Sequence, residues 1–122
     1  MLKVKTILKQ SEIHGIGLFA DEFIPKGTLI FEEDEFTVKF NNEEVQNFTE
    51  KKVEFIKKYC YLRDDVWYCS MDNDRFTNHS NIPNTYETET FTFAAKDIQP
   101  GEEITTNYQS ICDKYEEKFT KQ

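Results

Sequence analysis

The sequence RFTNHSNIPNT, residues 75–85, is the stretch from which this chain is best interpreted. It is polar and rich in turn-forming residues, because Asn side chains bond to nearby backbone and Pro83 fixes its own φ. An ordinary exposed loop would have the same composition. The stretch becomes informative together with two other blocks: IHGIGLFA at residues 13–20 and PGEEITTNY at residues 100–108. We therefore base the prediction of fold and function on the three blocks together.

The length and composition indicate one small domain that covers residues 1–122. A chain of 122 residues has room for one modest hydrophobic core. Aromatic residues make up 15% of it, with 11 Phe and 6 Tyr, and these residue types favour strands. No apolar run approaches the ~20 residues that span a bilayer, and the first residues, MLKVK, lack the apolar segment of a signal peptide. We expect a soluble, intracellular protein without a membrane partner.

The chain is acidic, with a formal net charge of −8 and a pI near 4.8. Direct nucleic-acid binding is disfavoured, because phosphate contacts need clustered Lys and Arg. A negative charge suits the attraction of a basic partner such as a Lys-rich peptide. It also keeps a protein soluble, and on charge alone solubility is the better explanation.

The three cysteines, Cys60, Cys69 and Cys112, show no C-x-x-C spacing. A zinc site needs four ligands, and only His14 and His79 could supplement these thiols. We expect all three cysteines to be reduced structural thiols, and we expect no metal site.

The hydrophobic pattern predicts a mostly-β protein of many short strands. Alternating apolar residues predict extended segments at residues 3–9, 18–20, 28–40, 66–71, 91–95 and 103–108. An inserted helical segment is expected at about residues 42–62, because Asn41 and Glu44 can form a capping box before an apolar helical face. A short terminal helix is expected to begin at Ser110.

The three blocks resemble the signature blocks of the SET-domain protein lysine methyltransferases, and the resemblance runs from about Ile7 to Tyr108. It implies a SET-domain fold of several small sheets with one inserted helix and a C-terminal pseudoknot. It also implies S-adenosyl-L-methionine as cofactor and methyl transfer to a lysine side chain of a basic protein such as a histone. The alternative is a non-catalytic SET module that binds a basic protein tail as an adaptor.

The resemblance also implies the site residues. Without the family, the glycines would be assigned to turns, the histidine to an exposed loop and the tyrosine to the core. In the family, the glycine loop approaches the methionine part of the cofactor, and the Asn-His block grips it. The residues implied for cofactor binding are Gly15, Ile16, Gly17, Asn78, His79, Tyr108 and, as a lid, Tyr115. Tyr108 is also the expected catalytic residue.

The sequence departs from a common pattern of the family at two places. Many relatives carry Cys after the matching Asn-His-Ser and again near the C-terminus, where the cysteines hold zinc, whereas this chain has Asn81 and a single downstream Cys112. It therefore resembles the compact stand-alone SET proteins of viruses and bacteria, which would place it in a cytoplasm or in a host nucleus. Thr106 stands where many relatives have the Phe or Tyr that influences methyl number, so the number of methyl groups stays open. A homodimer that completes the substrate surface also stays open.

Overall fold

The structure is a computed structural model, and it describes residues 1–108 of the 122. Its strands are β1 (Thr6–Gln10), β2 (Ile16–Ala20), β3 (Leu29–Glu32), β4 (Thr37–Asn41), β5 (Tyr61–Arg63), β6 (Val66–Ser70), β7 (Asn78–His79), β8 (Thr85–Thr88), β9 (Phe91–Ala94) and β10 (Thr105–Thr106). Its helices are α1 (Asn42–Val45), α2 (Glu50–Tyr59) and the 3₁₀ helix η1 (Asn73–Phe76). The expected terminal helix, with Tyr115, lies outside the described residues.

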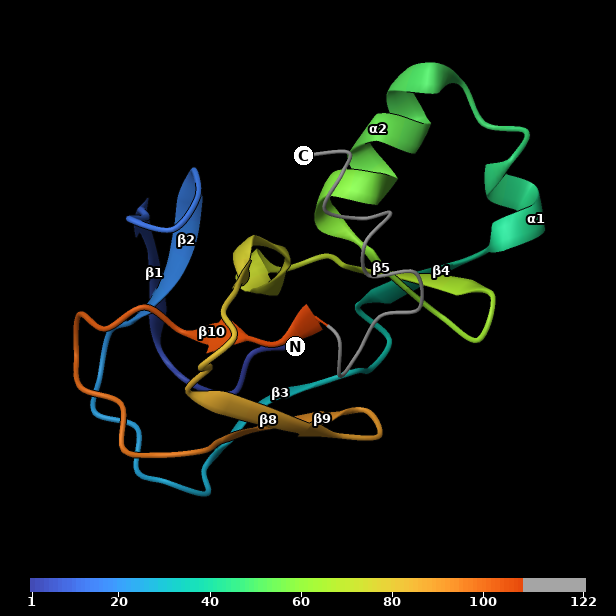
Figure 1. Ribbon diagram of the computed structural model, residues 1–122. Coiled ribbons are helices and arrows are strands. Elements are labelled where there is room, and N and C mark those ends of the chain that lie inside the picture. The colour runs from blue at the N-terminus through green and yellow to red at the C-terminus, as the bar shows by residue number, and fades with distance from the viewer. Residues whose placement is uncertain (109–122) are drawn as a thin grey trace.

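The strands form several small sheets (Figure 1). β1 and β2 form an antiparallel ribbon, and β7 and β10 form a parallel pair. The two larger sheets have the orders β3-β9-β8 and β4-β6-β5. The mostly-β prediction is confirmed. None of the helices in residues 1–108 is long and apolar enough to cross a membrane.

The extended segment predicted for residues 28–40 is broken into two strands. Thr37 donates its backbone N–H to the carbonyl of Asp34 at 3.0 Å, and the Asp34 carboxylate accepts from Phe36 N at 2.9 Å. Because of this turn, β3 pairs with β9 in one sheet and β4 pairs with β6 in another. Asp is favoured at such turns because its side chain bonds the backbone two residues on.

The inserted helical segment is shorter than predicted and divided in two. The capping box of Asn41 and Glu44 is present at the start of α1. The expected continuation to Leu62 is wrong, because the chain leaves α2 after Tyr59 and forms β5. The residues between β5 and β6, Asp64 and Asp65, have φ values of 52° and 65°, which suit a tight hairpin turn.

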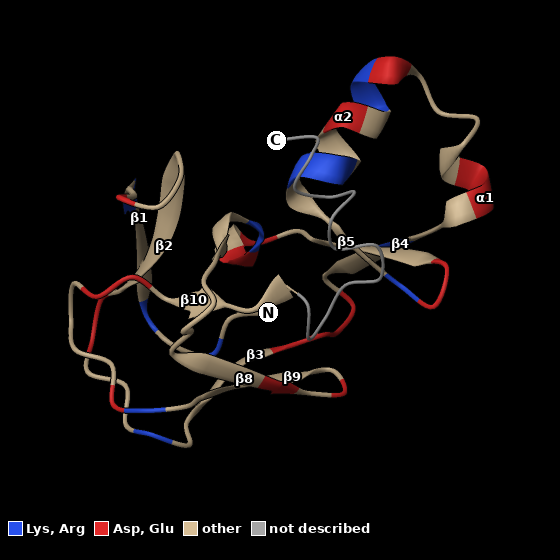
Figure 2. Ribbon diagram, in the orientation of Figure 1, with Lys and Arg blue, Asp and Glu red and all other residues tan. Residues whose placement is uncertain are grey.

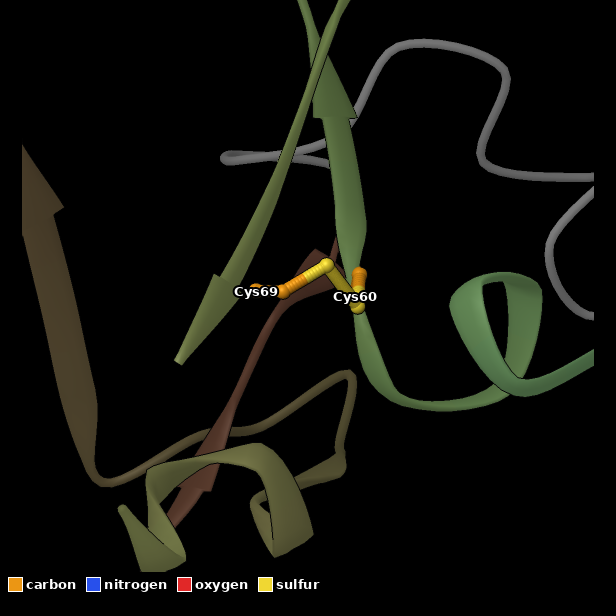
Figure 3. The surroundings of a disulfide bond; sticks show 2 residues. All are labelled: Cys60 and Cys69. Atoms are coloured by element: carbon orange, nitrogen blue, oxygen red, sulfur yellow. A yellow bond between two sulfur atoms is a disulfide. The ribbon is translucent and has the colours of Figure 1, made fainter. Parts of the chain in front are cut away.

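Cys60 and Cys69 form a disulfide (Figure 3), so the prediction of reduced thiols is wrong for this pair. Tyr61 pairs with Tyr68 across the β5–β6 hairpin, which makes Cys60 and Cys69 the next pair along. Their Cα atoms are 4.6 Å apart, within the range that a disulfide bridges. The hairpin register brings them together, and the sequence spacing gave no sign of it. Cys112 lies outside the described residues.

The buried apolar side chains gather in two clusters rather than in one core. One cluster contains Leu18, Ala20, Ile24, Ile30, Phe31, Ala94, Ile98 and Ile104, and the other contains Val45, Ile56, Cys60, Leu62, Trp67 and Cys69. Figure 1 shows β10 in the middle of the molecule, with the β4-β6-β5 sheet and the helices on one side of it. Residues from both clusters or packed against them, such as Phe31 and Tyr59, line one cavity between them.

Candidate active site

The Asn-His block and the C-terminal block lie side by side. Asn78 and His79 form β7, which pairs in parallel with β10, Thr105 opposite Asn78 and Thr106 opposite His79. The backbone N–H of Ser80 extends the pairing by donating to Thr106 O at 2.9 Å. Two of the three predicted blocks are therefore neighbours in the fold.

Asn84 and Thr85 hold the same C-terminal segment from its other side. The Asn84 amide donates to Glu103 O at 2.8 Å and accepts from Thr105 N at 2.9 Å. The Thr85 hydroxyl donates to Thr105 O at 2.8 Å. The segment that contains β10 is thus enclosed between β7 and the 84–85 turn, and its buried backbone groups are paired. This enclosure agrees with the C-terminal pseudoknot that the sequence predicts.

The Glu103 carboxylate joins all three blocks. The Ser11 hydroxyl lies 2.7 Å from Glu103 Oε1 and 2.9 Å from Oε2, and the Asn78 amide donates to Oε2 at 2.9 Å. The Ser11 oxygen also accepts from Ile13 N at 2.9 Å, which holds the start of the glycine loop. Hydrogen bonds to an ionised carboxylate are stronger than neutral ones. One acidic side chain therefore fixes the mutual position of the blocks.

Glycine is needed at positions 15 and 17 for two different structural reasons. Gly15 has φ +47°, and a Cβ placed on it would meet nothing within 4 Å. A Cβ on Gly17 would lie 2.4 Å from Glu103 Oε2. Gly17 therefore makes room for the Glu103 side chain, whereas Gly15 provides a left-handed turn beside open space.

Asn78 holds the glycine loop through its side chain. Besides Glu103, its amide nitrogen lies 3.0 Å from His14 O and 3.4 Å from Ile16 O. The residue is only 8% exposed, so these bonds satisfy a buried polar group. Asn78 thereby sets the conformation of the loop on which Gly15 sits.

His79 is positioned by hydrogen bonds from both ring nitrogens. Its Nδ1 accepts from the backbone N–H of Tyr108 at 3.1 Å, so the ring proton belongs on Nε2. Nε2 lies 2.8 Å from Asn81 Oδ1 and donates to it. The imidazole thus supports the backbone that carries Tyr108.

Contacts of both its hydroxyl and its ring fix the side chain of Tyr108. Its hydroxyl donates to Thr77 O at 2.6 Å, and its ring lies 5.5 Å from the His79 ring, centroid to centroid. A phenolic oxygen and a backbone carbonyl oxygen are therefore held next to each other, directly before the Asn-His block.

Next to this pair lies a cavity of about 200 Å³, which we name the glycine-loop cavity. Its lining includes His14, Gly15, Ile16, Thr77, Asn78 and Tyr108. Lys58 and Arg75 also line it and supply positive charge. The cavity thus combines backbone from the loop with two cationic side chains.

The structure brings four of the predicted cofactor residues to this cavity: Gly15, Ile16, Asn78 and Tyr108. Gly17 and His79 do not line it, since one packs on Glu103 and the other on the backbone of Tyr108. Tyr115, the predicted lid, lies outside the described residues.

Next to Thr77 and Tyr108 also lies a smaller cavity of about 70 Å³, which we name the acidic cavity. Its lining includes Glu33, Asp74, Glu87, Tyr61, Thr77 and Tyr108. Figure 2 shows that acidic residues occur on β8, on η1 and after β3, three separate segments of the chain. Four residues line both cavities: Tyr59, Arg75, Thr77 and Tyr108. The hydroxyl–carbonyl pair of Tyr108 and Thr77 therefore lies where the two cavities adjoin.

One wall of the acidic cavity is a paired network. The Tyr61 hydroxyl donates to Glu33, and Arg63 Nη2 lies 3.2 Å from each Glu33 carboxylate oxygen. The Arg63 guanidinium also lies 4.3 Å from the centre of the Tyr68 ring. Burial and the Glu33 carboxylate raise the pKa of Tyr61 well above its ordinary value, so this phenol stays protonated.

Sequence reasoning missed the roles of Ser11, Glu103 and Asp74. Glu103 lies inside the recognised PGEEITTNY block, and its place in that block was the only available signal. Nothing in the sequence distinguishes Ser11. Asp74 belongs to an acidic group of residues, 72–74, that suggests an exposed turn but lines a cavity instead.

Comparisons with known proteins agree with this geometry. "Putative histone-lysine N-methyltransferase 1" of Plasmodium falciparum (isolate 3D7) is 29% identical in an alignment 121 residues long that covers 87% of this chain. The chain spans about 2% of the length of that relative. A solved Plasmodium falciparum structure, named as a putative histone methyltransferase, has a TM-score of 0.62 and 24% identity over 88% of this chain and 95% of that one.

A structure of Polycomb Repressive Complex 2 from Chaetomium thermophilum is also similar, with a TM-score of 0.71 and 24% identity. The match covers 96% of this chain and 17% of that one. The family model described as "SET domain" matches residues 15–109, which include the second and third blocks whole and residues 15–20 of the first. This chain belongs to the SET-domain family.

Proposed function

We propose that this protein is an S-adenosyl-L-methionine-dependent protein-lysine N-methyltransferase that acts on a basic protein such as a histone. The observation that carries the proposal is the meeting of two cavities at Tyr108 and Thr77. Methyl transfer to lysine needs such an arrangement, in which the methyl donor and the amine approach from opposite sides of a narrow junction. The family and the names of its relatives support the same reaction.

The residues of the glycine-loop cavity fit S-adenosyl-L-methionine. Gly15 borders open space, and the backbone of residues 14–16 offers polar groups to a ligand. Lys58 and Arg75 suit the carboxylate of an amino-acid moiety. Asn78 and His79 would act by holding the loop and the Tyr108 backbone. When bound, this cofactor supplies a methyl group that is already activated by the positive sulfur.

Tyr108 and Thr77 would orient the amine at the junction. The phenol oxygen and the Thr77 carbonyl oxygen are fixed 2.6 Å apart, so both can accept weak C–H···O contacts from a methyl group. Holding the two reactants in line removes much of the entropic barrier of a reaction between separate molecules. Because only an uncharged amine is a nucleophile, the lysine must lose a proton before transfer.

The acidic cavity favours lysine as the acceptor. Its carboxylates attract the ammonium group, and its tyrosine rings can pack against the aliphatic part of the side chain. The net charge of −8 attracts basic segments from a distance. These features support a Lys-rich tail as the substrate class, in agreement with the relatives named as histone methyltransferases.

Two measurements test this proposal. The first is calorimetry with S-adenosyl-L-methionine, and the second is mass spectrometry of core histones after incubation with the enzyme. We expect cofactor binding and mass increases of 14 Da per methyl group on lysine, as the reaction requires. Asn78→Ala should weaken cofactor binding by about tenfold or more, because the glycine loop loses charge-assisted and buried hydrogen bonds. Asn47→Ala, at an exposed site, is the matched control. A protein that binds histone peptides, but does not bind the cofactor and does not methylate lysine, would instead be an adaptor.

A further inference from the structure

Asp74 lies beside the Tyr108–Thr77 pair. Thr77 connects the two groups, because its carbonyl oxygen accepts from the Tyr108 hydroxyl at 2.6 Å and its own hydroxyl lies 3.4 Å from Asp74 Oδ1. Asp74 lines the acidic cavity together with these two residues. An amine that reaches Tyr108 from this cavity therefore enters a space that the Asp74 side chain also lines.

The Asp74 carboxylate is poorly satisfied. Within residues 1–108, its only hydrogen-bond donor is the Thr77 hydroxyl at 3.4 Å. That hydroxyl lies closer, at 2.7 Å, to the Asp74 carbonyl oxygen and has one proton to donate. A carboxylate in a cavity without a strong donor favours the arrival of a cation or of a proton.

The other three carboxylates of the cavity are either partnered or exposed to solvent. Glu33 is neutralised by Arg63 and also accepts a hydrogen bond from the Tyr61 hydroxyl. Glu87 accepts from the Thr106 hydroxyl, and Glu89 is exposed to solvent. Asp74 is therefore the carboxylate of this cavity that is best prepared to interact with an incoming ammonium group.

We propose that Asp74 accepts the proton that the ammonium group of the substrate lysine must lose before methyl transfer; this inference rests on the proposed function. One N–H bond of the ammonium breaks, and its electron pair stays on nitrogen as the lone pair of the amine. The proton forms an O–H bond with the Asp74 carboxylate and passes to solvent afterwards. The charged pair becomes a neutral pair, which the burial of Asp74 favours over the charged one.

The proton affinity of Asp74 suits this role. Burial and, next, the neighbouring charges of Asp72 and Glu87 raise the pKa of Asp74 to about 7, against a lowering by the Thr77 hydroxyl. A general base works best when its pKa lies near the working pH. The charged groups that face Asp74 are the carboxylates Glu33, Asp72, Glu87 and Glu89 and the cations Arg63, Arg75 and the N-terminal amine. The phenols around the cavity are Tyr59, Tyr61, Tyr68 and Tyr108.

The first test measures cation binding without cofactor or turnover. NMR titration with n-butylammonium chloride, a mimic of the lysine side chain, is compared between the wild type, Asp74→Asn and the control Glu43→Gln, which removes one exposed carboxylate. We expect Asp74→Asn to weaken binding at pH 8 by about tenfold or more, and Glu43→Gln to leave it unchanged. Equal binding by the wild type and Asp74→Asn would overturn the inference, whatever the fate of the proposed function.

The second test follows single-turnover methyl transfer against pH. The wild-type rate should rise through about pH 7. The rate of Asp74→Asn should be about a hundredfold lower at pH 7 and should recover towards pH 10, where lysine loses its proton to solvent. Asp72→Asn should move the wild-type rise to lower pH, because it removes a charge that raises the pKa of Asp74. Parallel profiles for the wild type and Asp74→Asn would overturn the inference, whereas a wild type without activity or cofactor binding would overturn the proposed function.

Discussion

Replacing Asp74 with Asn should change how the stability of the protein depends on pH. The pKa of Asp74 is raised from 3.8 to about 7 in the folded protein, chiefly by burial. In the unfolded chain the carboxyl ionises near pH 4, whereas in the folded protein it keeps its proton until about pH 7. Between these values the folded state binds the extra proton, so the free energy of unfolding falls as pH rises.

The size of the effect follows from the two pKa values. One pKa unit corresponds to about 1.4 kcal/mol, so a rise from 3.8 to about 7 lowers the wild-type stability by roughly 4 kcal/mol across that interval. The Asn variant lacks this titration. Its stability relative to the wild type should therefore increase from pH 4 to pH 8 by an amount of that order.

Urea denaturation of both proteins at each pH measures the difference directly, because the contributions of all other titrating groups cancel to first order. The Glu43→Gln variant, which loses an exposed carboxylate, should follow the wild type throughout. A constant difference between the wild type and Asp74→Asn from pH 4 to pH 8 would refute the assigned environment of Asp74.

Gly17→Ala should destabilise the fold by about 3 kcal/mol or more, because the new Cβ would displace Glu103 and break its charge-assisted hydrogen bonds. Gly15→Ala should cost about 1 kcal/mol, the strain of a positive φ without a clash, and equal melting curves of the two variants would contradict this reasoning. Reduction of the Cys60–Cys69 disulfide, whose sequence separation is 9, should lower the stability by about 3 kcal/mol and the melting temperature by about 10 °C. An unchanged melting temperature under reducing conditions would refute the stabilising role of this disulfide.

Local sequence patterns predicted part of the fold well. The capping box of Asn41 and Glu44 begins a helix as expected, because both partners lie within one turn. The β5 strand could not be predicted, since residues 61–63 continue the apolar helical pattern and become a strand only by pairing with β6. The disulfide was missed for the same reason, because the register of that hairpin brings Cys60 and Cys69 together.

The candidate site was predicted from its blocks but not from its internal contacts. The position of Tyr108 follows from the block that carries it, whereas its partner, the Thr77 carbonyl, is a backbone atom without a sequence signal. The resemblance explains Gly17 by the approach of a cofactor, and the structure explains it by the Glu103 side chain. Contacts between segments about 90 residues apart, such as Ser11 with Glu103, depend on the enclosed C-terminal segment and need the full topology.

The central claim is that the Tyr108 hydroxyl, held 2.6 Å from Thr77 O, orients the reacting groups. Tyr108→Phe keeps the ring and removes only this oxygen, so the fold should persist. The most direct measurement is the single-turnover rate of methyl transfer from S-adenosyl-L-methionine to lysine, with mass-resolved products and cofactor affinity measured alongside. We predict a loss of about a hundredfold or more in rate with nearly unchanged cofactor affinity. A folded Tyr108→Phe protein with the wild-type rate and the wild-type products would contradict the assignment of Tyr108.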